Sequence, residues 1–233
     1  MKKKQFIFWF CNFILILNLF SCKTKNNIEI LPEKVKEVLT DYGKENSEEN
    51  IIIKTEFGDI HVMLYNQTPL HRANFIRLIK LKHFDNARFY RIVSDFMIQG
   101  GNQNVKEQKF TIPAEFDNKF INKKGAIAMA RRDENNPYKQ SSPTEFFIIR
   151  GRPYNMESLK DAIKESGRNF ESYSRDQIDT YLKYGGDARI DNLYTVFGEV
   201  TKGIEIVEKI ADEKVYEIEK PIQKLPFKII IDK

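Results

Sequence analysis

The sequence predicts a mainly β fold, and three observations lead to that class. Many short apolar runs with the alternation of β-strands follow one another from residue 51 onward. Only two helical stretches recur among these runs, which indicates a closed or nearly closed barrel. A further stretch at about 155–187 is strongly polar, has helical spacing and interrupts the series, so we interpret it as a helical insertion.

The composition is that of a globular chain with a small excess of positive charge. Of the 233 residues, 41% are hydrophobic and 30% are charged, which excludes wholesale disorder, collagen-like repeats and a polytopic membrane protein. Residues 1–21 contain three lysines and no acidic residue, so the formal charge of +5 falls by three to +2 without them. We therefore expect no nucleic acid partner.

The N-terminus has the pattern of an export signal. Three lysines precede an apolar run of about 15 residues from Phe6 to Phe20, which suits a signal-peptide core better than a membrane span. The next residues complete a Leu-Phe-Ser-Cys motif at 19–22 that resembles the lipobox of bacterial lipoproteins. The resemblance implies that Cys22 becomes the first mature residue and carries acyl chains, which anchor it to a membrane. The alternative is a membrane anchor that stays attached.

Residues 22–50 are expected to form a polar tether and residues 51–233 the folded domain. Loop-forming residues dominate the tether, although Pro32 can open a short helix with Val35, Val38 and Leu39 on one face. The chain has two cysteines, in the predicted signal and at its cleavage point, so no disulfide is expected. The three histidines lack metal-ligand spacing and are interpreted as ordinary surface or strand residues, so we expect no metal.

The first elements of the domain form a hairpin followed by a helix. Residues 51–57 and 60–65 alternate as strands around a Gly-Asp turn, and Thr68 offers a hydroxyl N-cap before Pro69. Apolar residues at helical spacing after Pro69 predict one apolar stripe facing a sheet. Further strands are expected at 88–93, 96–100, 125–130, 145–149, 194–200 and 226–232, and a second helix at about 203–211.

The insertion reads as a helical hairpin between two barrel strands. Met156, Leu159 and Ile163 lie at i, i+3 and i+7, a second stretch follows, and Gly185-Gly186 ends it. Two interpretations stay open for this segment. It is either a surface excursion, or a lid or partner surface beside a site.

The residues with the most chemical content lie between Phe89 and Asn102. On strands, Arg91 and Val93 point to one side, and so do Met97 and Gln99, while Gly100-Gly101 is expected to let the chain turn tightly. From these residues alone, the arginine is either a functional cation or one half of a salt bridge beside a hydrophobic core.

The run from Phe89 to Gly101 resembles the cyclophilin signature, Phe-His-Arg-x-x-x-x-Phe-Met-x-Gln-Gly-Gly. Residues 69–75, 125–130, 144–148 and 194–200 resemble further blocks of that family, in the family's order, over about 51–233. The resemblance implies a closed eight-stranded antiparallel β-barrel capped by two α-helices. It also implies peptidyl-prolyl cis-trans isomerase activity, with no cofactor.

The resemblance also assigns site residues by position. Arg91 is the implied catalytic group. The implied proline pocket consists of Phe96, Met97, Phe147, Ile190 and Tyr194. The implied peptide-binding partners are Gln99, the main chain at Ala130 and Arg131, and Glu145 at the rim. The family's usual pattern has other residues at Tyr90 (histidine), Glu145 (glutamine), Arg131 (asparagine), Tyr194 (histidine) and Arg189 (tryptophan in the best-known eukaryotic members).

Together these features predict a folding catalyst that accelerates X-Pro bond rotation in exported proteins. Its partners are expected to be proline-containing polypeptides, and its place the bacterial cell envelope, lipid-anchored outside the cytoplasm. A second function stays open, a proline-peptide binding or chaperone module in which turnover is incidental.

Overall fold

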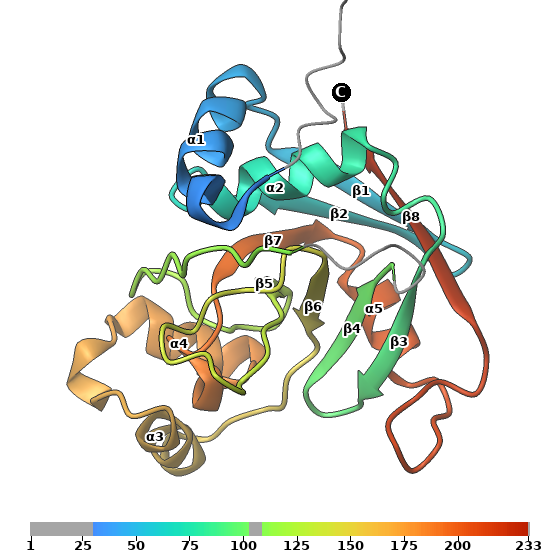
Figure 1. Cartoon of the computed structure of the whole chain (residues 1–233). Helices are drawn as coiled ribbons and strands as arrows, with labels where there is room; N and C mark the ends of the chain where they lie inside the picture. Colours follow the sequence, from blue (N-terminus) through green and yellow to red (C-terminus); the bar gives the residue numbers. More distant parts are fainter. Residues whose placement is uncertain (1–29, 103–108, 233) are drawn as a thin grey trace, which may run out of the picture.

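A closed antiparallel barrel of eight strands forms the centre of the computed structural model, which describes residues 30–102 and 109–232 (Figure 1). The strands are β1 (Asn50–Thr55), β2 (Gly58–Leu64), β3 (Ala87–Val93), β4 (Met97–Gly101), β5 (Ala126–Met129), β6 (Glu145–Ile149), β7 (Val196–Lys202) and β8 (Leu225–Ile231). They follow one another around the barrel as β1-β2-β7-β5-β6-β4-β3-β8, and β8 pairs with β1 to close it. The predicted fold class is therefore confirmed.

In the described part of the chain, five α-helices surround the barrel. The two predicted in the barrel framework are α2 (Pro69–Lys80) and α5 (Ile204–Ala211). The other three are α1 (Val35–Glu45), which precedes the barrel, and α3 (Met156–Glu165) and α4 (Arg175–Tyr184), which form the insertion between β6 and β7. Short 3-10 turns complete the list: η1 (Pro32–Lys34), η2 (Phe170–Ser172) and η3 (Ala188–Ile190). No helix in the described part of the chain is both long and apolar enough to cross a membrane.

Strand alternation divides the barrel side chains into two separate clusters. Ile92, Ile98 and Phe146 point inward and belong to the main core of the barrel. Their neighbours Met97 and Phe147 belong to a second cluster on the outer face of the same strands. Since successive strand residues point to opposite faces, one short sequence supplies both the core and an apolar outer surface.

Gly100 and Gly101 serve close packing, which corrects the tight turn expected at this position. Both residues lie within β4, and neither has a positive φ. A Cβ atom on Gly100 would lie 2.7 Å from the Phe227 ring, and one on Gly101 would lie 2.8 Å from the Thr144 carbonyl oxygen. Any larger residue would therefore push a core aromatic ring or the neighbouring strand away.

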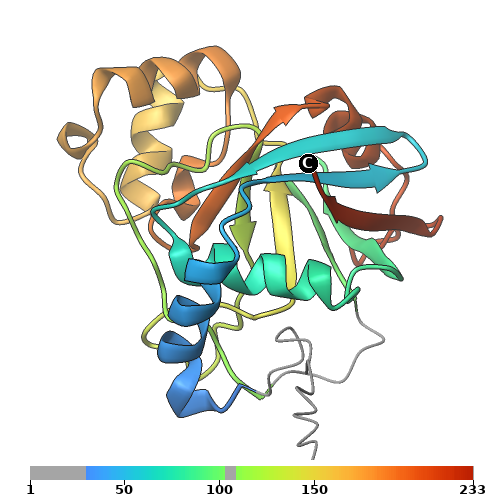
Figure 2. The ribbon, with the colours of Figure 1, turned by 90° about the horizontal axis from the view of Figure 1, so that it is seen from above.

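Helix α1 packs on α2, so much of the expected tether is part of the folded body (Figure 2). Leu39 is fully buried, and Ile30 and Val35 also join the main core. This contact shortens the tether predicted at 22–50, of which residues 22–29 lie outside the described residues. The packing has a local cause, because Pro32 opens the turn and the apolar side chains of α1 then share one face.

Helix α2 is buried on more than the single apolar stripe that its sequence predicts. The polar residues His71, Asn74 and Arg77 are buried together with its apolar positions. Helix α1 packs on one side of α2, and the segment 115–143 covers another, where Asn74 donates to the Pro143 carbonyl at 2.7 Å. Thr68 precedes the helix without capping it, and its hydroxyl donates instead to the carbonyl of Tyr65 at 3.3 Å.

Two of the three histidines are buried, which corrects their interpretation as ordinary surface or strand residues. The His71 ring lies 2.6 Å from a carboxylate oxygen of Glu115 and 2.9 Å from the Ser141 hydroxyl. His83 is 8% exposed, and burial, assisted by the nearby Arg77, lowers its pKa to about 4. His83 is therefore neutral at physiological pH, and both residues are structural.

A buried carboxylate joins the insertion to the barrel. The insertion has its own apolar core, and beside it Asp191 is fully buried. One Asp191 oxygen accepts from the Tyr173 and Tyr181 hydroxyls at 2.7 and 2.8 Å. The other accepts from the backbone and side-chain nitrogens of Asn122 at 2.8 and 2.9 Å. Burial raises the Asp191 pKa, and these four hydrogen bonds act in the opposite direction.

We predict that Asp191→Ala destabilises the protein and loosens the insertion. The change leaves the Tyr173 and Tyr181 hydroxyls and the Asn122 amide buried without their acceptor, so we expect a loss of at least about 3 kcal/mol. Urea unfolding measures this loss, and limited proteolysis reports opening of residues 155–187. The control is Asp179→Ala on α4, whose side chain is 63% exposed and whose loss should leave stability unchanged. Equal stability of the two variants would contradict the role of Asp191.

Candidate active site

Four of the sequence-predicted site residues, Arg91, Met97, Gln99 and Phe147, come together on the outer face of β3, β4 and β6. In the strand register Arg91 lies opposite Gln99, and Gln99 lies opposite Phe147. These three side chains therefore form a row across three neighbouring strands. Met97 extends the row on β4, two residues before Gln99 and on the same face.

All five residues of the predicted proline pocket lie in one apolar cluster. Met97 and Phe147 are almost completely buried and form its floor, while Phe96, Ile190 and Tyr194 are half-buried around it. The Phe96 and Phe147 ring centroids are 6.1 Å apart, and the Tyr194 ring meets Phe147 edge-on at 5.3 Å. The cluster also contains small residues of the neighbouring strands that the sequence did not indicate: Ala126, Ala128 and Val196.

A continuous chain of polar contacts passes through Arg91. The Arg91 Nε donates to a Glu219 carboxylate oxygen at 2.7 Å, and its Nη1 donates to the Gln99 side-chain oxygen at 3.2 Å. The Gln99 amide nitrogen donates to the Tyr90 hydroxyl at 2.9 Å, and that hydroxyl donates to Glu145 at 3.0 Å. The guanidinium therefore has two hydrogen-bond partners, Glu219 and Gln99. Gln99 is in turn held by Tyr90, which is itself bonded to Glu145.

Burial and a neighbouring charge keep Tyr90 protonated. Burial of the ring raises the Tyr90 pKa most, and the Glu145 carboxylate raises it further. Its hydroxyl therefore stays a donor to Glu145 at every pH at which the protein works. Tyrosine at this position also means that the residue before Arg91 does not titrate near neutral pH, as a histidine would.

Arg131 and Glu145 do not pair with each other. The Arg131 Nη1 lies 2.5 Å from Asp133, its Nε donates to the Leu193 carbonyl at 2.8 Å, and its guanidinium lies 4.8 Å from the centre of the Tyr194 ring. Burial raises the Tyr194 pKa, with a smaller contribution from the Asp133 charge. Arg131 therefore fixes one wall of the pocket by contacts to the segment that carries Tyr194.

The main chain of Ala130 already takes part in the sheet. Its N–H donates to the Glu145 carbonyl at 2.8 Å, and its carbonyl accepts from the Ser142 N–H at 2.7 Å. Only the second lone pair of that carbonyl remains for a ligand. Of the two backbone positions predicted to bind peptide, Arg131 is therefore the one that the sheet leaves more accessible.

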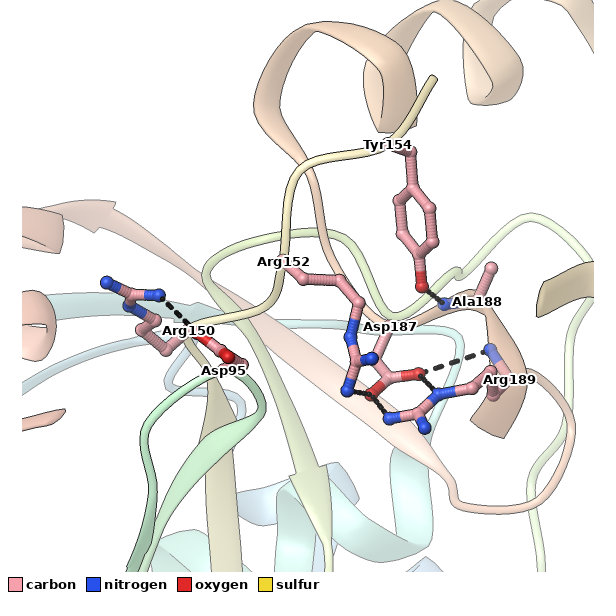
Figure 3. Close-up of polar contacts among 7 residues, drawn as sticks. All are labelled: Asp95, Arg150, Arg152, Tyr154, Asp187, Ala188 and Arg189. Atoms are coloured by element: carbon pink, nitrogen blue, oxygen red, sulfur yellow. Dashed lines mark hydrogen bonds and ion pairs between the residues drawn. The ribbon is translucent and has the colours of Figure 1, made fainter. Parts of the chain in front are cut away.

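Arg189, beside the pocket residue Ile190, is held by a buried carboxylate (Figure 3). Its Nε and Nη2 lie 2.9 and 2.6 Å from the two oxygens of Asp187, which is fully buried, and Arg152 approaches the same carboxylate at 4.0 Å. Arg150, on the next segment, pairs with Asp95 at 3.3 Å. Arg152 and Arg189 therefore share one buried carboxylate next to Ile190, and Arg150 has an acidic partner of its own.

The residue that the sequence did not reveal is Glu219. It lies 128 residues after Arg91, in the loop 212–224 between α5 and β8. Nothing in its local sequence marks it, because it stands among other charged residues of an irregular segment.

Helix α3 packs on η3, which carries Ile190, so the insertion supports one wall of the pocket from behind.

Comparisons with known sequences agree with this geometry. Residues 50–230 match the family model described as cyclophilin-type peptidyl-prolyl cis-trans isomerase/CLD. A peptidyl-prolyl cis-trans isomerase of Acinetobacter baylyi is 32% identical over 185 residues, which cover 76% of this chain and 81% of the relative.

Comparisons with solved structures show the same fold. A cyclophilin-type isomerase of Cryptosporidium parvum matches with a TM-score of 0.59 at 19% identity, over 80% of this chain and 98% of that one. A second structure of that protein, determined in the presence of the dipeptide Ala-Pro, matches with a TM-score of 0.58 at 19% identity over 79% and 99% of the two chains.

We predict that Tyr90→Phe weakens the polar chain without removing the pocket. The change takes the acceptor from the Gln99 amide and the donor from Glu145, so we expect a stability loss of about 1–2 kcal/mol. Urea unfolding measures the loss, and the Gln99 side-chain amide signal in NMR reports whether its hydrogen bond is gone. Tyr138→Phe is the control, since that side chain is 79% exposed. An unshifted Gln99 signal would show that the contact to Tyr90 does not exist in solution.

Proposed function

The chain belongs to the cyclophilin-type peptidyl-prolyl cis-trans isomerase family, and from this we propose that Arg91 and the pocket beside it isomerise X-Pro bonds in exported proteins. The enzyme is a peptidyl-prolyl cis-trans isomerase of this family. The observation that supports the site is the position of Arg91, at the edge of an apolar cluster and held by two side chains.

The reaction needs a cation more than it needs acid–base chemistry. An X-Pro bond resists rotation because the nitrogen shares its lone pair with the carbonyl, with a barrier of about 18–20 kcal/mol. As the bond twists, that lone pair localises on the proline nitrogen and becomes a hydrogen-bond acceptor. A guanidinium placed there binds the twisted state more strongly than either planar state, which lowers the barrier.

The contacts of Arg91 suit this role. Its Nε and Nη1 are occupied by Glu219 and Gln99, and within the described residues its Nη2 has no hydrogen-bond partner. Nη2 is therefore the group that we assign to the proline nitrogen. Arginine suits the position because it stays charged and its planar fork is directional.

The apolar cluster is suited to hold the proline ring. Phe96, Phe147 and Ile190 present apolar surface around a floor formed by Met97. A ring held there stays fixed while the preceding part of the peptide rotates. The Cryptosporidium parvum relative, whose structure was determined in the presence of Ala-Pro, supports a proline-containing ligand.

The N-terminal sequence supports a place outside the cytoplasm. The charged start, the apolar run and the motif ending at Cys22 have the order of a lipoprotein signal, and we infer that Cys22 carries the lipid. Ile30, where the described fold begins, lies eight positions after Cys22, so the chain between them can reach at most about 30 Å. The isomerase would thus work within a few nanometres of the membrane on newly exported chains.

We predict that Arg91→Ala lowers isomerase turnover at least about tenfold while the protein stays folded, because the cation acts on the twisted state. Arg91→Lys should be nearly as damaging, since an ammonium lacks the fork. NMR exchange spectroscopy on a proline peptide gives the turnover, and circular dichroism the fold. Arg175→Ala, at a residue with a 93% exposed side chain on the insertion, should keep full activity.

The outcomes of this experiment separate the two functions. Wild-type turnover in folded Arg91→Ala would remove Arg91 from the mechanism. Tight peptide binding by a wild-type protein with negligible turnover would favour the binding or chaperone module instead.

We predict that Cys22→Ser abolishes lipid attachment in the native bacterium. Mass spectrometry of the membrane-extracted wild type should find a lipid-modified peptide that begins at Cys22. The variant should lose that mass, and should either be released or keep its signal. Cys11→Ser is the matched control, because Cys11 lies within the part to be removed. Wild-type protein that retains residues 1–21 in its membrane would overturn this localisation.

A further inference from the structure

We propose that Glu219 is a positioning residue of the active site, which orients the Arg91 guanidinium for the twisted X-Pro bond. The inference rests on the proposed role of Arg91 and adds a residue from a distant loop to the site. Glu219 is not expected to touch the substrate. It acts through Arg91, by deciding which of the guanidinium donors face the ligand.

The contact between the two side chains is close and charged. The Glu219 carboxylate lies 2.7 Å from the Arg91 Nε, which is the range of a strong charge-assisted hydrogen bond. Both side chains are about two-fifths exposed, so the contact alone would contribute little to folding stability. Its effect is instead on orientation, because a long arginine side chain otherwise samples many rotamers.

A second contact makes the orientation unique. Gln99 accepts from Nη1, while Glu219 accepts from Nε. These two donors lie at different positions of one planar group, so two acceptors from different elements fix both its place and its plane. Neither acceptor uses the Nη2 donors of Arg91, so these donors are left for the substrate. A guanidinium held in this way needs no reorganisation when the substrate twists.

The backbone of Glu219 is tied to the strand that carries Arg91. The Ile92 N–H donates to the Glu219 carbonyl at 2.8 Å, one residue beyond Arg91. Glu219 itself has φ +60°, in the left-handed region that residues other than glycine seldom adopt. A turn closed by Tyr216 and Lys220 keeps it there, with Tyr216 N–H donating to the Lys220 carbonyl at 2.9 Å. The loop thus holds an unfavourable conformation that aims the carboxylate at Arg91.

The turn that carries Glu219 lies against β3, beside a surface hollow. This hollow of about 550 Å³ has a lining that includes Tyr90, Arg91, Tyr216 and Ile218. The Arg91 side chain is 42% exposed, so a peptide can reach the guanidinium while Glu219 holds it.

The test measures kcat and KM separately, in the full-length chain, for two variants of Glu219 and one control variant. Glu219→Ala removes the acceptor, and we expect kcat to fall about fivefold to tenfold with KM changed less than twofold. Glu219→Gln keeps an oxygen that can accept from Nε, so it should recover part of that loss. The matched control is Glu217→Gln, an exposed residue of the same loop, which should match the wild type. The probe is a proline-containing tetrapeptide.

Two further measurements exclude a merely structural effect. The Arg91 Nε–Hε signal in NMR should broaden or shift in Glu219→Ala while the backbone signals of β3 stay in place. In an Arg91→Lys background, Glu219→Ala should cause no further loss of kcat, because the group that it orients is gone.

Three outcomes would overturn the proposal. Unchanged kcat in Glu219→Ala shows that the orientation is irrelevant, and increased kcat shows that Glu219 competes with the substrate for Arg91. An equal loss in the Arg91→Lys background shows that Glu219 acts elsewhere. A failure of the proposed function is distinguishable, since Arg91→Ala would then stay active while the NMR contact between Arg91 and Glu219 persists.

Discussion

The alternation of side chains along the barrel strands governs both the core and the site of this protein. In a closed barrel every second residue must fill the interior, so its neighbours necessarily form the outer surface. Ile92, Ile98 and Phe146 fill the inside, while Arg91 and Phe147 lie outside. Core and site are therefore built from alternate residues of the same strands, β3, β4 and β6, and the packed core holds the site residues in place.

Polar contacts across the strands give the site its direction. The barrel surface alone would leave Arg91 free to move, but Gln99 and Glu219 hold it from two sides. Tyr90 and Glu145 in turn hold Gln99, so the contacts span β3, β4, β6 and the loop before β8. Arg91, Gln99 and Tyr90 each make two of these four hydrogen bonds, so we expect the loss of one bond to affect its neighbours. The substitutions at positions 90 and 145 relative to the usual family pattern belong to this one network.

The insertion at 155–187 and helix α1 both belong to the same folded body as the barrel. The insertion closes on the buried Asp191 and packs on η3, next to the pocket residue Ile190. Its role is therefore more than that of a surface excursion, since it forms the support of one pocket wall. Near the start of the chain, α1 buries Leu39 in the main core, so the folded part begins closer to the predicted lipid anchor.

The strands, the two framework helices, the insertion and the row of site residues could be predicted from the amino-acid sequence alone. These features depend on local periodicity and on a short signature, and local backbone geometry translates both directly into structure. Which distant segments lie side by side is visible only in the folded protein. Gly100 is required by the ring of Phe227, α1 joins the core, and Glu219 reaches Arg91 across 128 residues. Such contacts follow from the closure of the barrel and the path of its loops, and no pattern of neighbouring residues encodes them.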